Sequence, residues 1–253
     1  MLVAVMNGDA EKVAELMRQD PGFNVNMAVD GYGNTLLHYA CGSGNSSAVI
    51  PLLLPHPDID VNVETRGGYT PFSVACATGS TSCVREMLKD SRVKVNEPDN
   101  DGWTPLWRAA YFGYLDIIKW WIASGREMYL GIPGDVDNTD AIEVAKKRGK
   151  MELVTLLERF EENPVKTKHA VRVELGLVDD LAAEMFALVV FVSDGLLQVN
   201  DTTPSPAAKF FSIASQLPLE LQMVLCFRQV GSLMEIIRGK DSEVAFKELA
   251  KRI

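Results

Sequence analysis

The histidines and cysteines of this chain are too few and too scattered to make a familiar catalytic or metal site. Among 253 residues there are three histidines and four cysteines. They are His38, His56, His169, Cys41, Cys76, Cys83 and Cys226. None has the spacing of a zinc site, and the chain has no nucleophile elbow and no glycine loop that could cradle phosphate. The sequence therefore predicts no enzyme, no catalytic residue and no bound cofactor.

Oxygen ligands gather in one acidic segment, at residues 128–140. This segment contains Asp135, Asp137, Asn138 and Asp140. A calcium loop counted from Asp135 would need a glycine at its sixth position and a glutamate at its twelfth. Asp140 and Lys146 stand there instead. We therefore interpret the acids as turn-forming and helix-capping residues, and we predict no metal site.

Charge and hydropathy narrow the class of partner. The 34 acidic residues outnumber the 25 basic ones, for a net charge of −9, which disfavours a general affinity for nucleic acid or anionic membranes. The one basic cluster, at 146–148, is expected on a solvated helix face. The most apolar run, Met185–Val192, is much shorter than the ~20 residues that span a bilayer. The N-terminus does not resemble a signal peptide. We expect partners that are neither nucleic acid nor membrane.

Residues 99–125 show the local structure that must position any site. Gly102 follows an aspartate, as in tight turns where glycine takes a positive φ. Thr104 can cap a helix whose first residue is a proline, and Gly113 can end that helix. A second helix is predicted from about Leu115 to Ala123. The segment is thus a turn followed by two short helices.

This pattern recurs at a nearly constant period. A glycine between paired helices, with an alanine four residues before it, is found at Gly8, Gly44, Gly79, Gly113 and Gly149. The spacings are 36, 35, 34 and 36 residues. A Val-Asn pair follows the second helix at Val25-Asn26, Val61-Asn62 and Val95-Asn96. A single two-helix unit cannot bury its apolar face, so we expect five units, numbered one to five, to stack.

The repeated unit resembles the ankyrin repeat, whose pattern is Asp-x-x-Gly-x-Thr-Pro-Leu-His-x-Ala-Ala-x-x-Gly followed by a second helix. The resemblance implies an all-α solenoid of about five helix-turn-helix units with β-turn fingers over residues 1–162. In the family the histidine links the capping threonine to the neighbouring turn. His38 keeps that histidine in unit two, and a structural role is expected for it rather than that of a catalytic base.

Several positions depart from the ankyrin pattern. The histidine position holds Ser73 in unit three and Trp107 in unit four. Trp120 and Trp121 replace paired leucines in the second helix of unit four, and we expect them to pack against unit five. Asp140 takes the threonine position in unit five.

Cysteine usage indicates a compartment. Cys41 and Cys76 occupy the second small position of the Ala-Ala pair, so they are expected to be buried thiols. Unpaired buried thiols are typical of reducing compartments, so we expect the cytosol or the nucleus.

After residue 162 the repeat period is lost, and a C-terminal helical domain is predicted at residues 165–253. A helix at Leu177–Val199 is apolar nearly all round over 185–192, which favours burial within a bundle. Further helices are predicted at 207–216, 219–227 and 242–252. Leu217-Pro218-Leu219-Glu220-Leu221 followed by Val224-Leu225 resembles the opening of an F-box, although it also describes an ordinary helix start.

The ankyrin resemblance implies protein–protein recognition through the concave face, by a scaffold or adaptor without chemistry of its own. The family's variable positions fall on Tyr32, Asn34, Gly42, Ser43, Arg66, Tyr69, Ala77, Thr78, Asn100, Asp101, Trp103, Tyr111 and Phe112. Of these, Trp103, Tyr111 and Phe112 are predicted to converge on one binding patch. The alternative that the C-terminal domain covers this patch stays open.

Two further functional hypotheses remain. The F-box-like segment suggests a substrate receptor of a ubiquitin ligase, with ligase components as partners. A structural subunit that forms a homo-oligomer is the third possibility. The sequence names neither the partner nor the oligomeric state.

Overall fold

A computed structural model describes residues 1–20, 22–44, 47–130, 140–193, 210, 213–217, 221–223 and 225–226. Over these ranges the chain forms helices and turns and contains no β-strand, which confirms the all-α class. The helices are α1 (Leu2–Met6), α2 (Ala10–Gln19), α3 (Leu36–Gly42), α4 (Ile50–Leu53), α5 (Pro71–Thr78), α6 (Thr81–Lys89), α7 (Pro105–Phe112), α8 (Leu115–Ser124), α9 (Ala141–Lys147), α10 (Met151–Glu162), α11 (Pro164–Glu174) and α12 (Val178–Ser193).

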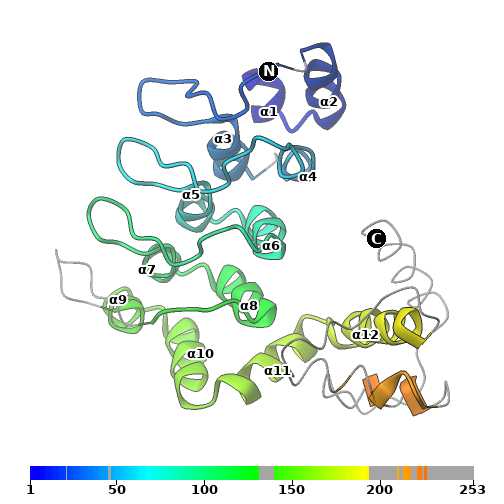
Figure 1. Ribbon diagram of the computed structural model, residues 1–253. Coiled ribbons are helices and arrows are strands. Elements are labelled where there is room, and N and C mark those ends of the chain that lie inside the picture. Colours follow the sequence, from blue (N-terminus) through cyan, green and yellow to red (C-terminus); the bar gives the residue numbers. More distant parts are fainter. Residues whose placement is uncertain are drawn as a thin grey trace. The chain divides into compact units, whose positions relative to one another are not determined.

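The chain divides into two compact parts, Met1–Lys168 and His169–Ile253. In the first part the helices stack as five antiparallel pairs, from α1–α2 to α9–α10 (Figure 1). The first helices form one column and the second helices form another, and long turns project from the column of first helices. The predicted solenoid of about five two-helix units is therefore confirmed.

Small side chains allow the first helices to stack closely. Ala40, Ala75, Ala109 and Ala145 lie at the same position of α3, α5, α7 and α9, and all four are completely buried. A larger side chain there would force neighbouring helices apart. The cysteines that follow two of these alanines, at positions 41 and 76, are also buried, as predicted.

The helix boundaries follow from the capping residues that the sequence supplies. The side chains of Thr70, Thr104 and Asp140 each accept a hydrogen bond from the backbone N–H three residues later. Gly79 and Gly113 end α5 and α7 in the left-handed conformation, with φ of 78° and 82°. These groups satisfy backbone donors and acceptors that a short helix leaves unpaired.

The recurring Val-Asn pairs connect each unit to the next. The side-chain amides of Asn26, Asn62 and Asn96 each donate to one backbone carbonyl and accept from one backbone N–H of the following unit, 30 to 34 residues further along. The six bonds are 2.6–3.2 Å long. The pattern was visible in the sequence, but this bridging role was not predicted.

The tryptophans of α8 contact side chains of unit three, and the expected packing of these rings against unit five stays a prediction. Trp121 is fully buried, and its ring meets the edge of Phe72 with 5.0 Å between centroids. The guanidinium carbon of Arg85 lies 3.9 Å from the centre of the Trp120 ring. Both rings therefore contribute to the packing between units three and four.

In the second part, the predicted long helix begins at Val178 and is described as far as Ser193. The buried core of the second part includes Phe186 and Val189 of this helix and also Cys226. Burial raises the pKa of the Cys226 thiol to about 12. The sequence did not predict α11. In the described residues no helix is long and apolar enough to span a membrane.

Several predictions for the second part fall outside the described residues. They concern the loop at 200–206, the helix at 242–252, parts of the helices at 207–216 and 219–227, and Pro218, Leu219, Glu220 and Val224 of the F-box-like motif. A separate C-terminal domain with its boundary at 162–165 stays a prediction.

Candidate partner-binding face

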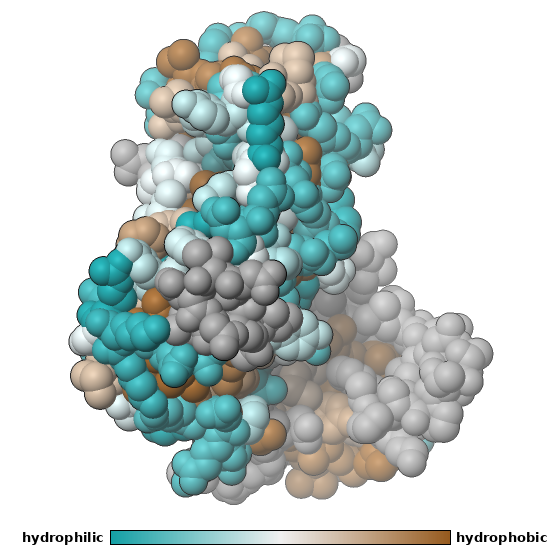
Figure 2. Space-filling model, turned by 90° about the vertical axis from the view of Figure 1, so that its left-hand side faces the viewer, coloured by the Kyte–Doolittle hydropathy of each residue, from teal (hydrophilic) through white to brown (hydrophobic). Residues whose placement is uncertain are grey.

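The turns that precede the first helices are fingers, each closed by a backbone hydrogen bond. The fingers of units two, three and four are residues 29–34, 65–69 and 99–103. We call the surface formed by these fingers and by α3, α5 and α7 the finger face. Figure 2 looks onto this side and shows small hydrophobic areas separated by hydrophilic ones.

Neighbouring fingers are joined by their backbones. The N–H of Arg66 donates to the carbonyl of Tyr32 at 2.9 Å, and the N–H of Asn100 donates to the carbonyl of Gly67 at 3.1 Å. The contact is close at Gly68, whose φ is +78°, because a Cβ there would lie 2.7 Å from the backbone nitrogen of Asn100. The fingers are thus fixed relative to one another before any partner binds.

An aspartate holds each of two fingers from within. Asp30 accepts hydrogen bonds from the backbone N–H groups of Tyr32 and Asn34, from the Asn34 side chain and from the Tyr39 hydroxyl. The Asn34 side-chain bond is the main cause that lowers the pKa of Asp30 to about 2. Its carboxylate therefore remains ionised and fully engaged at neutral pH.

In unit four the corresponding residue, Asp99, is buried and forms an ion pair. The Nε of Arg108 lies 2.9 Å from the Asp99 carboxylate, and a second guanidinium nitrogen also donates to it. That second nitrogen lies 2.7 Å from the Tyr69 hydroxyl in the finger of unit three. Arg108 thus joins two fingers, a role the sequence analysis missed. An arginine on a helix otherwise buried over residues 105–110 was the available signal.

His38 has the structural role predicted for it. Its Nδ1 accepts from the backbone N–H of Thr35 at 3.1 Å and lies 3.0 Å from that hydroxyl. Because Nδ1 accepts, Nε2 carries the ring proton and donates to the Tyr69 carbonyl at 2.9 Å. Burial is the main cause that lowers the pKa of His38. The ring is therefore a neutral link between units two and three.

Six of the predicted variable positions line one hollow on the finger face. The hollow has a volume of about 370 Å³ and lies between units two and three. Its lining consists of Tyr32, Asn34, Thr65, Arg66, Gly67, Tyr69, Val74, Ala77 and Thr78. This size falls within the usual range for pockets that accept a small ligand or a few side chains.

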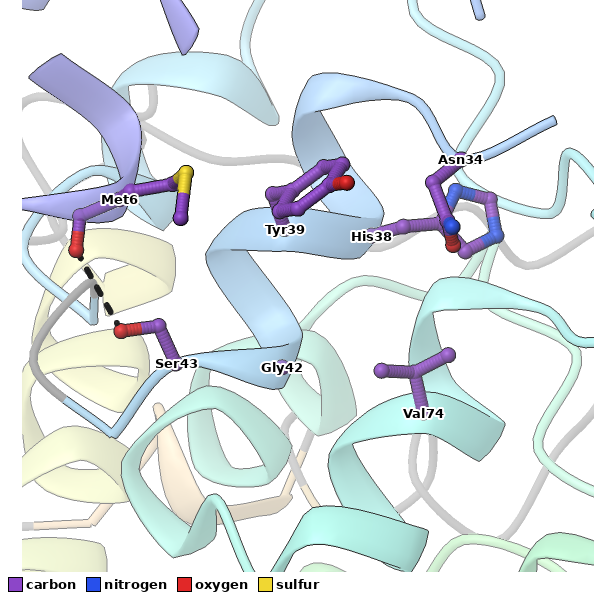
Figure 3. Close-up of a pocket in the computed structure, with 7 residues that line it drawn as sticks. All are labelled: Met6, Asn34, His38, Tyr39, Gly42, Ser43 and Val74. Carbon is purple, nitrogen blue, oxygen red and sulfur yellow. Dashed lines mark hydrogen bonds between the residues drawn. The ribbon is translucent and has the colours of Figure 1, made fainter. Parts of the chain in front are cut away.

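A second hollow of about 310 Å³ adjoins the first, because Asn34 and Val74 line both. Its other lining residues are Met6, His38, Tyr39, Gly42 and Ser43 (Figure 3). In Figure 3 these side chains come from α1, α3 and α5, and the Ser43 hydroxyl approaches the Met6 carbonyl at 3.5 Å. The sequence predicted Gly42 and Ser43 here but not Met6 or Val74.

The aromatic residues of unit four form a continuous row. Trp103 contacts Trp107 with 4.1 Å between ring centroids, Trp107 stacks on Tyr111 at 5.1 Å, and Tyr111 meets Phe112 at 5.0 Å. We call these four residues the aromatic row. Trp107 is buried with 4% of its surface exposed, whereas Phe112 is 44% exposed. The structure thus brings Trp103, Tyr111 and Phe112 together, with Trp107 as the link between them.

Two arginines, Arg108 and Arg148, lie over aromatic rings in or beside the aromatic row. The guanidinium carbon of Arg108 lies 4.6 Å from the centre of the Tyr69 ring and 5.0 Å from that of Trp103. That of Arg148 lies 3.7 Å from the centre of the Tyr111 ring. Such contacts are favourable because the face of an aromatic ring carries partial negative charge.

In the part of the chain that the structure describes, no group of three or more His, Cys, Asp or Glu side chains could hold a metal ion. Asp140 caps α9, while Asp135, Asp137 and Asn138 lie outside the described residues.

The fold brings Cys41 and Cys83 together, which their spacing did not predict. Both are buried, and burial raises the pKa of the Cys41 thiol. Neither condition favours a nucleophile.

Comparison with known proteins identifies the repeat. A family model described as ankyrin repeats in three copies matches residues 1–65 and 49–132, which together make up more than half of the chain. The chain belongs to the ankyrin repeat family. The match ends before α9, so the fifth ankyrin unit rests on the stacked helices α9 and α10.

The chain is similar to segments of much longer ankyrin-containing proteins. SMC5-SMC6 complex localization factor protein 1 of Homo sapiens is 38% identical over 98 residues, or 39% of this chain and 9% of that protein. Rabankyrin-5 of Homo sapiens is 38% identical over 81 residues, 32% of this chain and 7% of that protein. Tyrosine-protein kinase HTK16 of Hydra vulgaris is 27% identical over 136 residues, which are 53% of this chain and 17% of that protein. The chain therefore spans less than a fifth of each relative.

Proposed function

We propose that this chain is a non-catalytic scaffold or adaptor that binds another protein through the finger face, which corresponds to the concave face of the sequence prediction. The proposed binding residues are Tyr32, Asn34, Arg66, Tyr69, Asn100, Asp101, Trp103, Tyr111 and Phe112. One observation supports this more than any other. The hollow lined by Tyr32, Arg66 and Tyr69 is linked through Arg108 to the aromatic row, so the proposed residues of three units share one surface.

Side-chain exposure is consistent with binding by this surface. Tyr32 is 76% exposed and Phe112 is 44% exposed, although both are large enough to stabilise a core. Exposed aromatic side chains are the residues that most often dominate binding energy at protein interfaces. The backbone bonds between fingers also lower the cost of ordering the surface when a partner binds.

The names of the relatives agree with a role of this kind. One is named as a localization factor of the SMC5-SMC6 complex, which is a role in placing another assembly. The kinase similarity is confined to 17% of that protein and gives no reason to propose catalysis here. For this chain we keep the cytosol or the nucleus as the proposed compartment. The family match, within residues 1–132, gives no support to the ubiquitin-ligase alternative.

The test is a comparison of variants by affinity capture. Full-length chain, Tyr32→Ala, Phe112→Ala and the control Tyr129→Ala are immobilised, and proteins captured from a native extract are identified by mass. Tyr129 is a suitable control because it is also 44% exposed but lies in the connection after α8, outside both hollows and the aromatic row.

The proposal predicts that captured proteins are lost from Tyr32→Ala and Phe112→Ala and are retained by Tyr129→Ala, while all variants keep their melting temperature. Retention of the same proteins by all four chains would contradict binding through the finger face.

A further inference from the structure

Resting on the proposed function, we propose that the partner presents an extended acidic peptide segment to the finger face. One carboxylate of this segment would pair with Arg66, an apolar side chain would enter the hollow beside Tyr32 and Tyr69, and a second carboxylate would pair with Arg148. This assigns a chemical class to the partner and an order to its contacts along the array.

The first argument is that two acids of this face already have partners within the chain. Asp30 accepts four hydrogen bonds from its own finger and from Tyr39. Asp99 is buried against Arg108. Neither carboxylate can attract a basic partner strongly, because its donors would have to be displaced. Asp101 is an exposed acid in the finger of unit four, but it does not line the hollow beside Tyr32 and Tyr69.

The second argument is that cations of the chain itself occupy ring faces where a basic partner would bind. Arg108 lies over the rings of Tyr69 and Trp103, and Arg148 lies over Tyr111. Trp107, which continues the row between Trp103 and Tyr111, is buried. A lysine or methylated lysine of a partner would have to compete with these guanidinium groups for the same faces.

The third argument is that the side chain of Arg66 is placed to bind a carboxylate. This residue is exposed on the finger of unit three and lines the hollow. Within the described ranges its guanidinium has no ion-pair partner and no hydrogen-bond acceptor, and only its backbone is bonded, to Tyr32 and Asn100. A planar guanidinium of this kind presents paired N–H donors that match a carboxylate.

The fourth argument is that Arg148 supplies a second basic point on the same surface. It is exposed and lies over the Tyr111 ring, and within the described ranges its guanidinium N–H groups have no acceptor, so they can pair with a carboxylate. The Lys150 side chain adds positive charge nearby, since it lies against the end of α7 at Gly113. These charges stand out in a chain of net charge −9.

The repeat geometry sets the spacing of the two carboxylates. Arg66 belongs to unit three and Arg148 to unit five, so two steps of the stack separate them. Packed helices lie roughly 8–10 Å apart, which gives a span of about 20 Å. An extended chain advances about 3.3 Å per residue. Because Arg66 lies in a finger and Arg148 directly follows α9, this span is a lower bound, and the two acidic side chains of the peptide are expected at least about six residues apart.

The proposal is tested by panning a phage-displayed library of random peptides of about twelve residues, long enough for this span, against the full chain. Enriched peptides are synthesised, and their affinities are measured for the unchanged chain and for Arg66→Glu, Arg148→Glu and Arg18→Glu. Arg18 is the matched control, because it is an exposed arginine on α2, a second helix.

We expect enriched peptides to contain more Asp and Glu than the library. Arg66→Glu and Arg148→Glu should each weaken binding roughly threefold to tenfold, and Arg18→Glu should not. Binding should also weaken as salt concentration rises. Neutral or basic peptides that lose affinity with Tyr32→Ala but not with Arg66→Glu would overturn the acidic partner and leave the proposed function standing. Peptides insensitive to every finger-face substitution would overturn both, whereas an absence of enrichment would overturn the acidic peptide partner alone.

Discussion

His38 of unit two and Trp107 of unit four occupy the same position of the repeat, but they hold their neighbours differently. The His38 ring makes polar contacts with Thr35 and with the carbonyl of Tyr69 in the next finger. Trp107 instead stacks between Trp103 and Tyr111 of its own unit. Unit two is therefore joined to its neighbour by hydrogen bonds, while unit four is filled by aromatic packing.

The fingers of the two units differ in the same way. Neutral donors surround Asp30 in unit two, whereas the cation Arg108 pairs with Asp99 in unit four. The His38 ring lines the smaller hollow, whereas Trp107 is buried within the aromatic row. The same repeat position thus holds a polar link in unit two and an aromatic link in unit four.

The largest expected effect comes from removing the cation of unit four. Arg108→Leu leaves the Asp99 carboxylate buried without its partner, which should lower the free energy of unfolding by about 3–5 kcal/mol. Asn34→Ala in unit two removes only a neutral donor from the more exposed Asp30 carboxylate and should lower the free energy of unfolding much less. Denaturant unfolding measures both.

The double variant Arg108→Leu with Asp99→Asn is the control for this comparison. It should recover part of the loss, since no buried charge remains. Equal, small losses for Arg108→Leu and Asn34→Ala would show that the two fingers are held alike.

Giving unit four the histidine of unit two should have the next largest effect. Trp107→His removes most of a buried indole from the aromatic row, and we expect a loss of about 2 kcal/mol. Thermal unfolding measures this loss. An unchanged melting temperature would mean that the row contributes little to the stability of the array.

The free energy of unfolding should depend on pH because of the buried His38 of unit two. Burial lowers the pKa of His38 in the folded chain, so the unfolded chain binds the proton more readily. Stability from this group is complete above the unfolded pKa of about 6.5 and is lost as the pH falls below it. Denaturant unfolding at a series of pH values should show this slope. His38→Gln should reduce the slope, and an unaltered slope would contradict the assignment.

The smallest effect on stability is expected at the exposed ends of the face. Tyr32→Ala and Phe112→Ala should each change the free energy of unfolding by no more than about 0.5 kcal/mol, the usual size for exposed sites. Thermal unfolding of both variants tests this expectation. A loss of several kcal/mol for Phe112→Ala would show that its ring is a core element of the folded chain.

The parts of this structure that depend on neighbouring residues in sequence were predictable. Thr104, Gly113 and Asp140 start or end helices through contacts within a few residues. The role of His38 followed from the family pattern. One local element was missed: only the loss of the repeat period was noted after residue 162, although Pro164 is suited to the first turn of a helix, and α11 begins there.

Contacts between units could not be predicted in the same way. Arg108 and Tyr69 are 39 residues apart, and Cys41 and Cys83 are 42 apart. Their side chains meet only because the helices stack with a particular offset. The repeat period indicates which units are neighbours, but not which side chain of one reaches the next. For the same reason the contact of Trp121 with Phe72 in unit three was not predicted.

The most direct test of binding through the finger face is hydrogen–deuterium exchange of the full chain with and without a protein recovered by capture. We predict slower exchange on binding in the fingers at 65–69 and 99–103 and at the end of α7. Exchange in α2, α6 and α8 should not change. Protection confined to those second helices, or to residues 169–193, would contradict binding through the finger face.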